Sequence, residues 1–241
     1  MYEMAVFACA IAAGAIASVS GFGIGSLLTP LLALHAGTRT AVAAVSIPHL
    51  IGTGIRFWRL RASLDRTVLW RFGLMSAAGG LAGALLNATT PNPALTIVLA
   101  VLLMFAGLAQ VSGQAQRWQF HGSVAWIAGA ISGFFGGLVG NQGGIRSAAL
   151  LGFDLPKGRF VATATAIALF VDAARMPVYV VVQRAQVAAI WPLVLLATAG
   201  VVAGTLAGEG VLHHVSERRF KQVVGAIILL LGLFILAREV A

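Results

Sequence analysis

The segment GLVGNQGGIRSAALLGF, from Gly137 to Phe153, places glycines, amides and an arginine inside an apolar part of the chain. Glycine lowers helix stability by about 1 kcal/mol relative to alanine, so this cluster predicts a break in the helix. Backbone N–H groups freed at the start of the next helix carry partial positive charge and attract anions. An arginine beside them adds a permanent charge and a planar fork of donors that suits oxyanions. The segment therefore predicts a binding site for a small anion, formed by Gly140, Asn141, Gln142, Gly143, Gly144 and Arg146.

The same residues also have a structural explanation. Glycines in membrane helices often allow close packing of neighbouring helices. Arg146 could extend to the membrane surface or pair with an acidic residue, such as Asp154 or Asp172. An arginine deep in a membrane costs several kcal/mol, however, and this cost favours a functional role.

The composition places the chain in a membrane. Of its 241 residues, 59% are hydrophobic and only 10% are charged, and the mean hydropathy is +0.95. Soluble domains carry about one quarter charged residues. Several apolar runs reach the ~17–25 residues that a helix needs to cross a bilayer, which predicts an all-α integral membrane protein. The runs are Met4–Leu34, Thr40–Phe57, Val68–Leu86, Ala94–Val111, Val124–Leu151, Val161–Val182, Val187–Leu206 and Val223–Ala237.

The net charge of +9 fits the same setting. Most basic residues lie at the ends of apolar runs, so we expect membrane lipids, and no nucleic acid, as their partners. The segment RFWRLRASLDRTVLWR, from Arg56 to Arg71, is expected to be a cytoplasmic loop with Trp58 and Trp70 at the membrane surface. Cys9 is the only cysteine, which excludes disulfides and cysteine-based metal sites, and we expect no metal or cofactor.

The chain contains an internal repeat with an offset of 119 positions. The segment AGAIASVSGFGIG, from Ala13 to Gly25, superposes three of its glycines on those of SGFFGGLVGNQGG, from Ser132 to Gly144. The same offset places Arg56 on Arg175. We therefore expect a single membrane domain made of two pseudosymmetric halves. The halves are repeat one at 1–115 and repeat two at 120–241.

Each half opens with an apolar run that is too long for one crossing. At ~1.5 Å per residue, Met4–Leu34 would extend well beyond the ~30 Å of the hydrocarbon core. The glycines in both runs predict a break into two short half-helices that meet near the middle of the membrane.

The distribution of Lys and Arg favours inverted halves. If each half is a re-entrant helix pair plus three spans, the halves are inverted, and eleven basic residues lie on the cytoplasmic side and three outside. If each run crosses the membrane once, the halves are parallel, and eight basic residues lie on the cytoplasmic side and six outside. Cytoplasmic loops carry the excess of positive charge, so the sequence favours inversion. The eleven are Arg56, Arg59, Arg61, Arg66, Arg71, Arg117, Lys157, Arg159, Arg218, Arg219 and Lys221, and the three are Arg39, Arg184 and Arg238.

Inverted repeats with broken helices are typical of secondary transporters, which bind substrate near the midplane between the repeats. We expect the first glycine cluster to face the second across the anion, with three hydroxyl side chains at its sides. These hydroxyls could instead bond to backbone carbonyls. The residues are Gly21, Gly23 and Gly25, and Ser46, Thr163 and Thr165.

A second group of residues could serve coupling or gating. Asp172 and Arg175 lie three positions apart on one predicted helix, so they could form a structural ion pair, or Asp172 could carry a coupling proton. Arg56 occupies the position that matches Arg175, and His49 could titrate near neutral pH or simply be packed. A sodium ion is the other candidate for coupling.

The paired segments SGFGIGSLLTPLLALHAGTRTAVAAVS and GLVGNQGGIRSAALLGFDLPKGRFVATAT resemble the two halves of the TauE/SafE sulfite exporter family, also known as the toluene sulfonate uptake permeases. Each consists of a glycine cluster, an apolar run, a short polar turn and a small-residue helix, and the resemblance covers essentially the whole chain. It implies transport of sulfite or organosulfonates, such as sulfoacetate, across a bacterial inner membrane and coupled to an ion gradient. Both clusters depart from the family's usual Gly-x-Gly-Gly-Gly pattern.

Two other function classes are compatible with the sequence. A passive anion channel needs the same dry barrier and attractive site as a transporter. An intramembrane serine protease is less favoured, because SVSG, from Ser18 to Gly21, lacks the first glycine of the usual motif, so we expect no enzyme. A homo-oligomer is compatible with the sequence, which does not set the oligomeric state.

Overall fold

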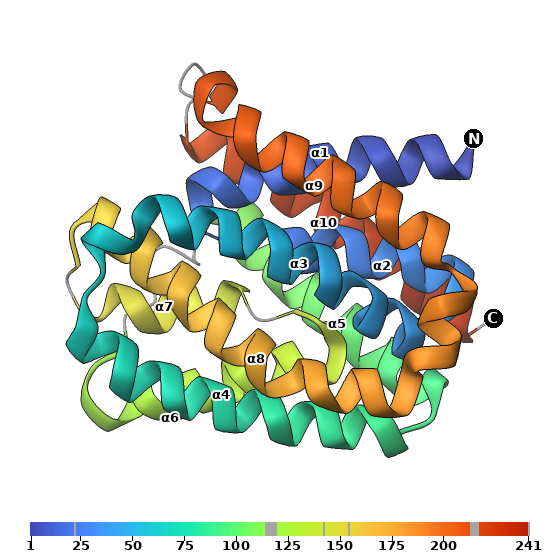
Figure 1. The fold of residues 1–241 in the computed structure, drawn as a ribbon, viewed down its shortest axis with the longest axis horizontal. Helices are drawn as coiled ribbons and strands as arrows, with labels where there is room; N and C mark the ends of the chain where they lie inside the picture. Colours follow the sequence, from blue (N-terminus) through green and yellow to red (C-terminus); the bar gives the residue numbers. More distant parts are fainter. Residues whose placement is uncertain (22, 114–119, 142, 154, 213–216, 241) are drawn as a thin grey trace.

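The computed structural model describes all residues except 22, 114–119, 142, 154, 213–216 and 241. Throughout this described part the chain is helical, with short connections and no β-strands (Figure 1). Seven of the described helices are long and apolar enough to cross a membrane, which confirms the predicted all-α, multi-pass class. The elements are α1 (Tyr2–Ser20), α2 (Ile24–Ala36), α3 (Thr38–Leu60), η1 (Arg61–Ser63), α4 (Arg66–Thr89), α5 (Asn92–Val111), α6 (Gly122–Val139), α7 (Gly143–Leu151), α8 (Lys157–Ala189), α9 (Trp191–Leu212) and α10 (Glu217–Val240).

The first long apolar run is broken, as predicted, between α1 and α2. Gly21 has a φ of 78° and Gly23 a φ of 134°. Residues with a Cβ rarely adopt positive φ, so both positions favour glycine. The Gly21 N–H donates to the Ala17 carbonyl at 2.9 Å and closes the end of α1. The chain then turns back, so that the N-terminus and the end of α2 lie at the same end of the molecule (Figure 1).

The second long run is broken in the same way between α6 and α7, where Gly140 has a φ of 74°. The two members of each pair are unequal, with 19 and 13 residues in the first pair and 18 and 9 in the second. The prediction of two short half-helices is therefore wrong for α1 and α6. The physical reason is that the glycines lie beyond the middle of each run, so the first helix of each pair reaches 19 or 18 residues before the break.

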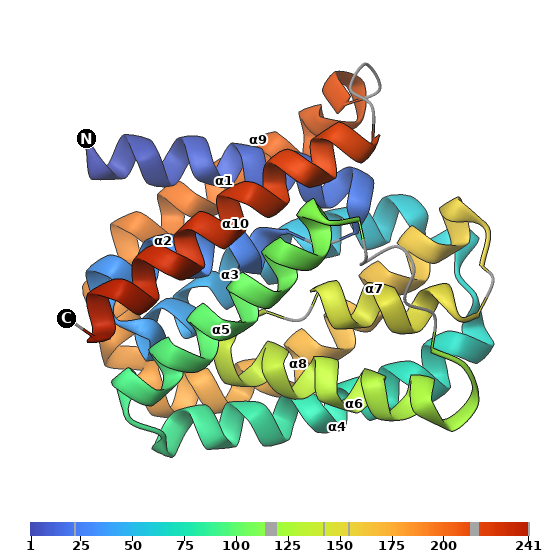
Figure 2. The same cartoon turned by 180° about the vertical axis from the view of Figure 1, so that it is seen from behind.

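Glycines bring four of the helices into close contact. A Cβ added at Gly79 or Gly83 of α4 would overlap a carbonyl of α6, and a Cβ at Gly204 of α9 would overlap a carbonyl of α1. Small residues allow such close backbone approach between membrane helices. Each broken pair therefore packs against a long helix from the other half of the chain (Figure 2).

The helices α3 and α8 pack against each other and lie toward the viewer in Figure 1. They carry most of the polar residues of the candidate site. α8 has 33 residues and includes Arg184. The gap between the predicted runs Val161–Val182 and Val187–Leu206 is therefore not a break, and the chain turns only at Ile190. An arginine near the end of a spanning helix is tolerated because its long side chain can reach the membrane surface.

The basic segment from Arg56 to Arg71, predicted to be a loop, comprises the end of α3, η1 and the start of α4, so the loop is limited to the short connection between these two long helices. Trp58 and Trp70 are exposed, as expected for residues at a membrane surface, and the Arg61 guanidinium carbon lies 3.9 Å from the centre of the Trp58 ring. The prediction that Arg56 belongs to this loop is wrong, because Arg56 lies inside α3 and is only 3% exposed. Arg56 is thus a buried charge and not one of the residues that orient the chain.

Candidate functional site

The two helix breaks lie against each other in the interior. A Cβ added at Gly25, in the first turn of α2, would overlap the carbonyl oxygen of Gly140. Ser26 donates a hydrogen bond to the side-chain oxygen of Asn141 at 3.1 Å, and both residues are buried. The structure thus brings the two predicted glycine clusters together, and the close approach leaves no room for a side chain at position 25.

The other glycines of the two clusters fix the local backbone. A Cβ added at Gly21 would lie 3.7 Å from the Ala164 side chain on α8, and one at Gly23 would lie 2.8 Å from Ile16 on α1. Gly143 and Gly144 are the first residues of α7, where backbone N–H groups lack helical acceptors. Gln142 lies outside the described residues, so its role as a donor stays a prediction.

Arg146 lies in the first turn of α7, next to the second break. It is 2% exposed, and its Nε and Nη1 atoms have no hydrogen-bond partner among the described residues. Its predicted structural partner Asp154 is outside that set, and the ion pairs found within it do not join Arg146 to Asp172. Buried donors without acceptors are unfavourable, and an anion bound here could accept hydrogen bonds from both atoms.

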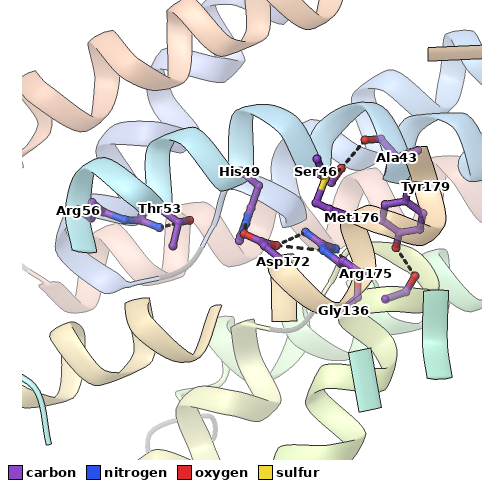
Figure 3. A network of polar contacts seen from close by, with 11 residues as sticks. Ala43, Ser46, His49, Thr53, Arg56, Gly136, Asp172, Arg175, Met176 and Tyr179 are labelled. Atoms are coloured by element: carbon purple, nitrogen blue, oxygen red, sulfur yellow. Dashed lines mark hydrogen bonds and ion pairs between the residues drawn. The ribbon is translucent and has the colours of Figure 1, made fainter. Parts of the chain in front are cut away.

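Asp172 is the centre of a buried polar network between α3 and α8 (Figure 3). Its Oδ1 atom lies 3.0 Å from Nε and 2.8 Å from Nη2 of Arg175, and its Oδ2 atom lies 2.7 Å from Nδ1 of His49. The ion pair predicted from the spacing of Asp172 and Arg175 is therefore present. His49 joins it from 123 positions earlier in the chain.

Arg56 is the counterpart of Arg175 in the first half, but its surroundings differ. Its Nη2 atom donates to the Thr53 hydroxyl at 2.9 Å, while Nε and Nη1 have no partner in the described part of the chain. The offset of 119 that relates Arg56 to Arg175 also relates Thr53 to Asp172. A neutral hydroxyl thus stands where the other half has a carboxylate, and Arg56 forms no ion pair with the residues that the structure describes.

These buried charges do not cancel. Among the described residues, three arginines that are each at most 3% exposed accompany one buried aspartate, so the excess within this set is 3 − 1 = 2 positive charges when His49 is neutral. The charge of Arg146 acts on Arg56, and that of Asp172 on all three arginines, so the groups form one electrostatic unit. An oxyanion among guanidinium groups would offset the cost of burying this charge. The cationic cluster comprises Arg56, Arg146, Arg175 and Asp172, and His49 lies beside it, hydrogen-bonded to Asp172.

The last carbonyls of α6 accept hydrogen bonds from three buried side chains. The donors are Arg175 Nη1 to Gly136 (2.5 Å), the Tyr179 hydroxyl to Gly137, and Asn87 Nδ2 to Leu138 (2.7 Å). The Gly136 carbonyl also accepts the Gly140 backbone N–H at 3.1 Å. The last carbonyls of a helix generally lack helical partners, so such side-chain donors stabilise the end. The break after α6 is thereby held against α8 and α4.

Three of the residues in this network were missed by sequence reasoning. They are Tyr179, Asn87 and Gln183, of which Gln183 donates to Asn87 at 2.9 Å. A signal was available on α8, because Asp172, Arg175, Tyr179 and Gln183 follow helical spacing and lie on one face. Asn87 carries no comparable pattern, since its partners come from other helices.

Two of the predicted hydroxyl side chains already have partners within the protein. Thr165 donates to the Val161 carbonyl at 2.7 Å, which is the backbone alternative to binding a substrate. Thr163 accepts a hydrogen bond from the Asp65 backbone N–H at 3.1 Å and so ties α8 to the segment before α4. Both threonines are fully buried.

A cavity of about 620 Å³ is lined mainly by residues of α3 and α8, among them Ala43 and Met176, the residue that follows Arg175 of the cationic cluster. Ser46 lines it, and the Ser46 hydroxyl donates to the Ala43 carbonyl at 2.5 Å and lies 2.8 Å from the sulfur of Met176 (Figure 3). Arg184 is the charged residue of its wall. The remaining lining residues are Ile47, Tyr179, Val180, Val187, Ala188 and Trp191.

Comparison with known proteins gives one family. A sequence model of the family described as Sulfite exporter TauE/SafE matches residues 6–235 of the chain. No curated protein and no solved structure gives a significant match. The match agrees with the resemblance found in the paired segments, and together with the seven candidate spans it indicates a membrane transporter and not an enzyme.

Proposed function

Because the chain belongs to the TauE/SafE sulfite exporter family, we propose that it is an ion-coupled secondary transporter for small sulfur oxyanions in the bacterial inner membrane. Sulfite and organosulfonates such as sulfoacetate are the proposed substrates. The observation that carries the proposal is the excess of two positive charges in the buried cationic cluster. An oxyanion there would offset the excess and would use the unpaired guanidinium donors of Arg56 and Arg146.

In the proposed binding mode the anion lies between the two helix breaks. Arg146 and the N–H groups at Gly143 and Gly144 would hold its oxygens, opposite the first glycine cluster. Because Ser26 donates to the side-chain oxygen of Asn141, the amide nitrogen of Asn141 is the group left to donate to an anion. Gln142 would be a further donor.

We propose that the two halves, 1–115 and 120–241, are inverted repeats. The α1–α2 pair begins and ends at one end of the molecule and the α6–α7 pair at the opposite end, which supports inversion (Figures 1 and 2). In the two halves, α1 to α5 correspond in order to α6 to α10. When corresponding helices are exchanged, the contact between α4 and α6 becomes the contact between α9 and α1, which the structure also contains. Under the same exchange, the α3–α8 and α5–α10 contacts map onto themselves. Inverted repeats around a midplane site are a recurring plan for secondary transporters.

The proposed orientation puts the end of α3 and the start of α8 in the cytoplasm. Removal of the buried Arg56 from the eleven basic residues assigned to that side leaves ten, against three on the other side. Cytoplasmic ends carry the excess of Lys and Arg, so the charge distribution still favours this orientation.

Alternating access would connect the site to each side in turn. The cavity beside the cluster lies at the end of α8 that carries Arg184, so it would be the outward entrance. Toward the other end, Arg159 lies 4.0 Å from Asp65, and the Asp65 N–H bonds to Thr163. These contacts would close the inward side, and rocking of one half against the other would release them.

The test is charge movement on a solid-supported membrane with proteoliposomes of the wild type and Arg146→Leu. Sulfite and sulfoacetate should give saturable currents in the wild type and none in the variant, while chloride gives none in either. The current through a passive channel would reverse at the equilibrium potential of the anion alone, whereas the current of a coupled transporter would reverse at a different potential. Absence of both current and radiolabelled uptake for the two sulfur anions would refute the proposal.

A further inference from the structure

His49 lies beside the cationic cluster, where α3 faces α8 (Figure 3). Its Nδ1 atom is 2.7 Å from Oδ2 of Asp172, and 8% of the His49 side chain is accessible while that of Asp172 is completely enclosed. An ionised carboxylate only accepts hydrogen bonds, so Nδ1 carries the hydrogen of this contact. Nε2 is therefore the nitrogen that can take up a proton and give His49 a positive charge.

Asp172 is poorly placed to take up that proton itself. Its Oδ1 atom faces two nitrogens of Arg175, and its Oδ2 atom faces His49. A protonated Asp172 would direct its O–H toward an N–H donor of Arg175 or His49, and it would leave the buried Arg175 without its counter-charge. The geometry thus favours a constant charge on Asp172 and a variable charge on His49.

The charged groups around His49 link its proton to the anion. Asp172 and Arg175 face it from α8, and Arg56 acts on it from the next turns of α3. Arg146 on α7 interacts with the same aspartate. While the site is empty, the excess of arginines opposes a further positive charge; a bound anion reverses this balance, so anion and proton favour each other's binding.

In the second half of the chain, protein side chains already occupy the type of site at which a coupling sodium ion usually binds. In transporters with broken helices, coupling cations bind carbonyls at the end of a half-helix. At the end of α6, the Gly136 and Gly137 carbonyls accept hydrogen bonds from Arg175 and Tyr179. The guanidinium of Arg175 thus stands where a coupling cation would bind, and the titratable His49 is left as the carrier.

We propose that the anion moves together with one proton, which His49 carries on Nε2 while Asp172 holds the ring in position. The inference rests on the proposed function as an anion transporter and specifies its coupling ion. Binding of the anion promotes protonation of His49 on one side of the membrane, and release of the anion promotes loss of the proton on the other.

The test uses the full chain in proteoliposomes with radiolabelled sulfoacetate as the probe and the membrane voltage held at zero by potassium and valinomycin. The sulfonate group is permanently ionised, so the probe does not cross lipid as a neutral acid. A tenfold proton gradient, acidic outside, should drive about tenfold accumulation in the wild type, because one proton moves per anion.

His49→Gln keeps an N–H donor for Asp172 but cannot take up a proton. It should lose accumulation driven by the proton gradient and retain sulfoacetate counterflow, which needs no net proton movement. The matched control is His121→Gln, which removes an exposed histidine at the start of α6 and should behave as the wild type.

The outcomes separate this inference from the function on which it rests. The proton assignment would be overturned if wild-type uptake does not depend on the proton gradient, or if His49→Gln retains about tenfold accumulation. Neither result would contradict the proposal that the protein is an anion transporter. Loss of counterflow as well as accumulation in His49→Gln would assign His49 to anion binding and also overturn it. Absence of counterflow in the wild type, for sulfite as well as sulfoacetate, would overturn the transporter proposal itself.

Discussion

Replacement of Arg146 with leucine should abolish anion transport without destabilising the protein. Arg146 is 2% exposed and two of its guanidinium nitrogens lack partners among the described residues, so the substitution removes two buried donors without acceptors in that set. Unpaired buried polar groups cost about 1–3 kcal/mol, so the free energy of unfolding should stay constant or rise by about that amount. Leucine also fits this kind of position, because the offset of 119 relates Arg146 to Leu27, which is 5% exposed.

The matched control is Arg175→Leu, which changes another arginine of the same cluster. Arg175 is bonded to Asp172, so its loss leaves a buried carboxylate with only His49 as a partner. Breaking a buried ion pair costs about 3–5 kcal/mol. At roughly 2–4 °C per kcal/mol for a chain of this size, the Tm should fall by about 6–20 °C.

Thermal unfolding of both variants in detergent, followed by tryptophan fluorescence, measures the contrast. The wild type and Arg146→Leu should melt at similar temperatures, or the variant higher, and Arg175→Leu well below both. If Arg146→Leu melts as far below the wild type as Arg175→Leu does, Arg146 is a structural counter-charge and the reasoning that assigns it to the anion is refuted.

Three further predictions concern packing, hydrogen bonding and orientation. Gly25→Ala should reduce stability by about 1–3 kcal/mol or more, because its Cβ meets backbone of the second break, whereas Gly54→Ala, with nothing within 4 Å, should be neutral in the same unfolding assay. Tyr179→Phe should cost about 1–3 kcal/mol, measured likewise, because it leaves a buried carbonyl of α6 unpaired. In a cysteine-free background, an impermeant maleimide added to intact cells should label Asn92→Cys and spare Ser63→Cys; the reverse pattern contradicts the proposed orientation.

The helix breaks could be predicted from sequence because they depend on local chemistry. Gly21 and Gly140 adopt the positive φ that favours glycine, and their 119-residue spacing marks them as related positions. The ion pair of Asp172 and Arg175 was also predictable, since three positions on a helix place two side chains side by side.

Other features depend on contacts that the sequence pattern does not contain. The bond between His49 and Asp172 joins residues 123 positions apart, and no helical period relates them. The burial of Arg56 was obscured by the basic loop that follows it, although its match with Arg175 in the repeat was a usable signal.

The most direct test of the anion site is to locate a heavier analogue of the substrate in crystals of the protein. Selenite has the shape and charge of sulfite, and its selenium atom gives an anomalous signal. An anomalous peak between the helix breaks, within hydrogen-bond reach of Arg146, is the predicted result. A peak found only at surface arginines such as Arg61 or Arg238, with the cationic cluster free of selenium, would contradict the assignment of this cluster as the anion site.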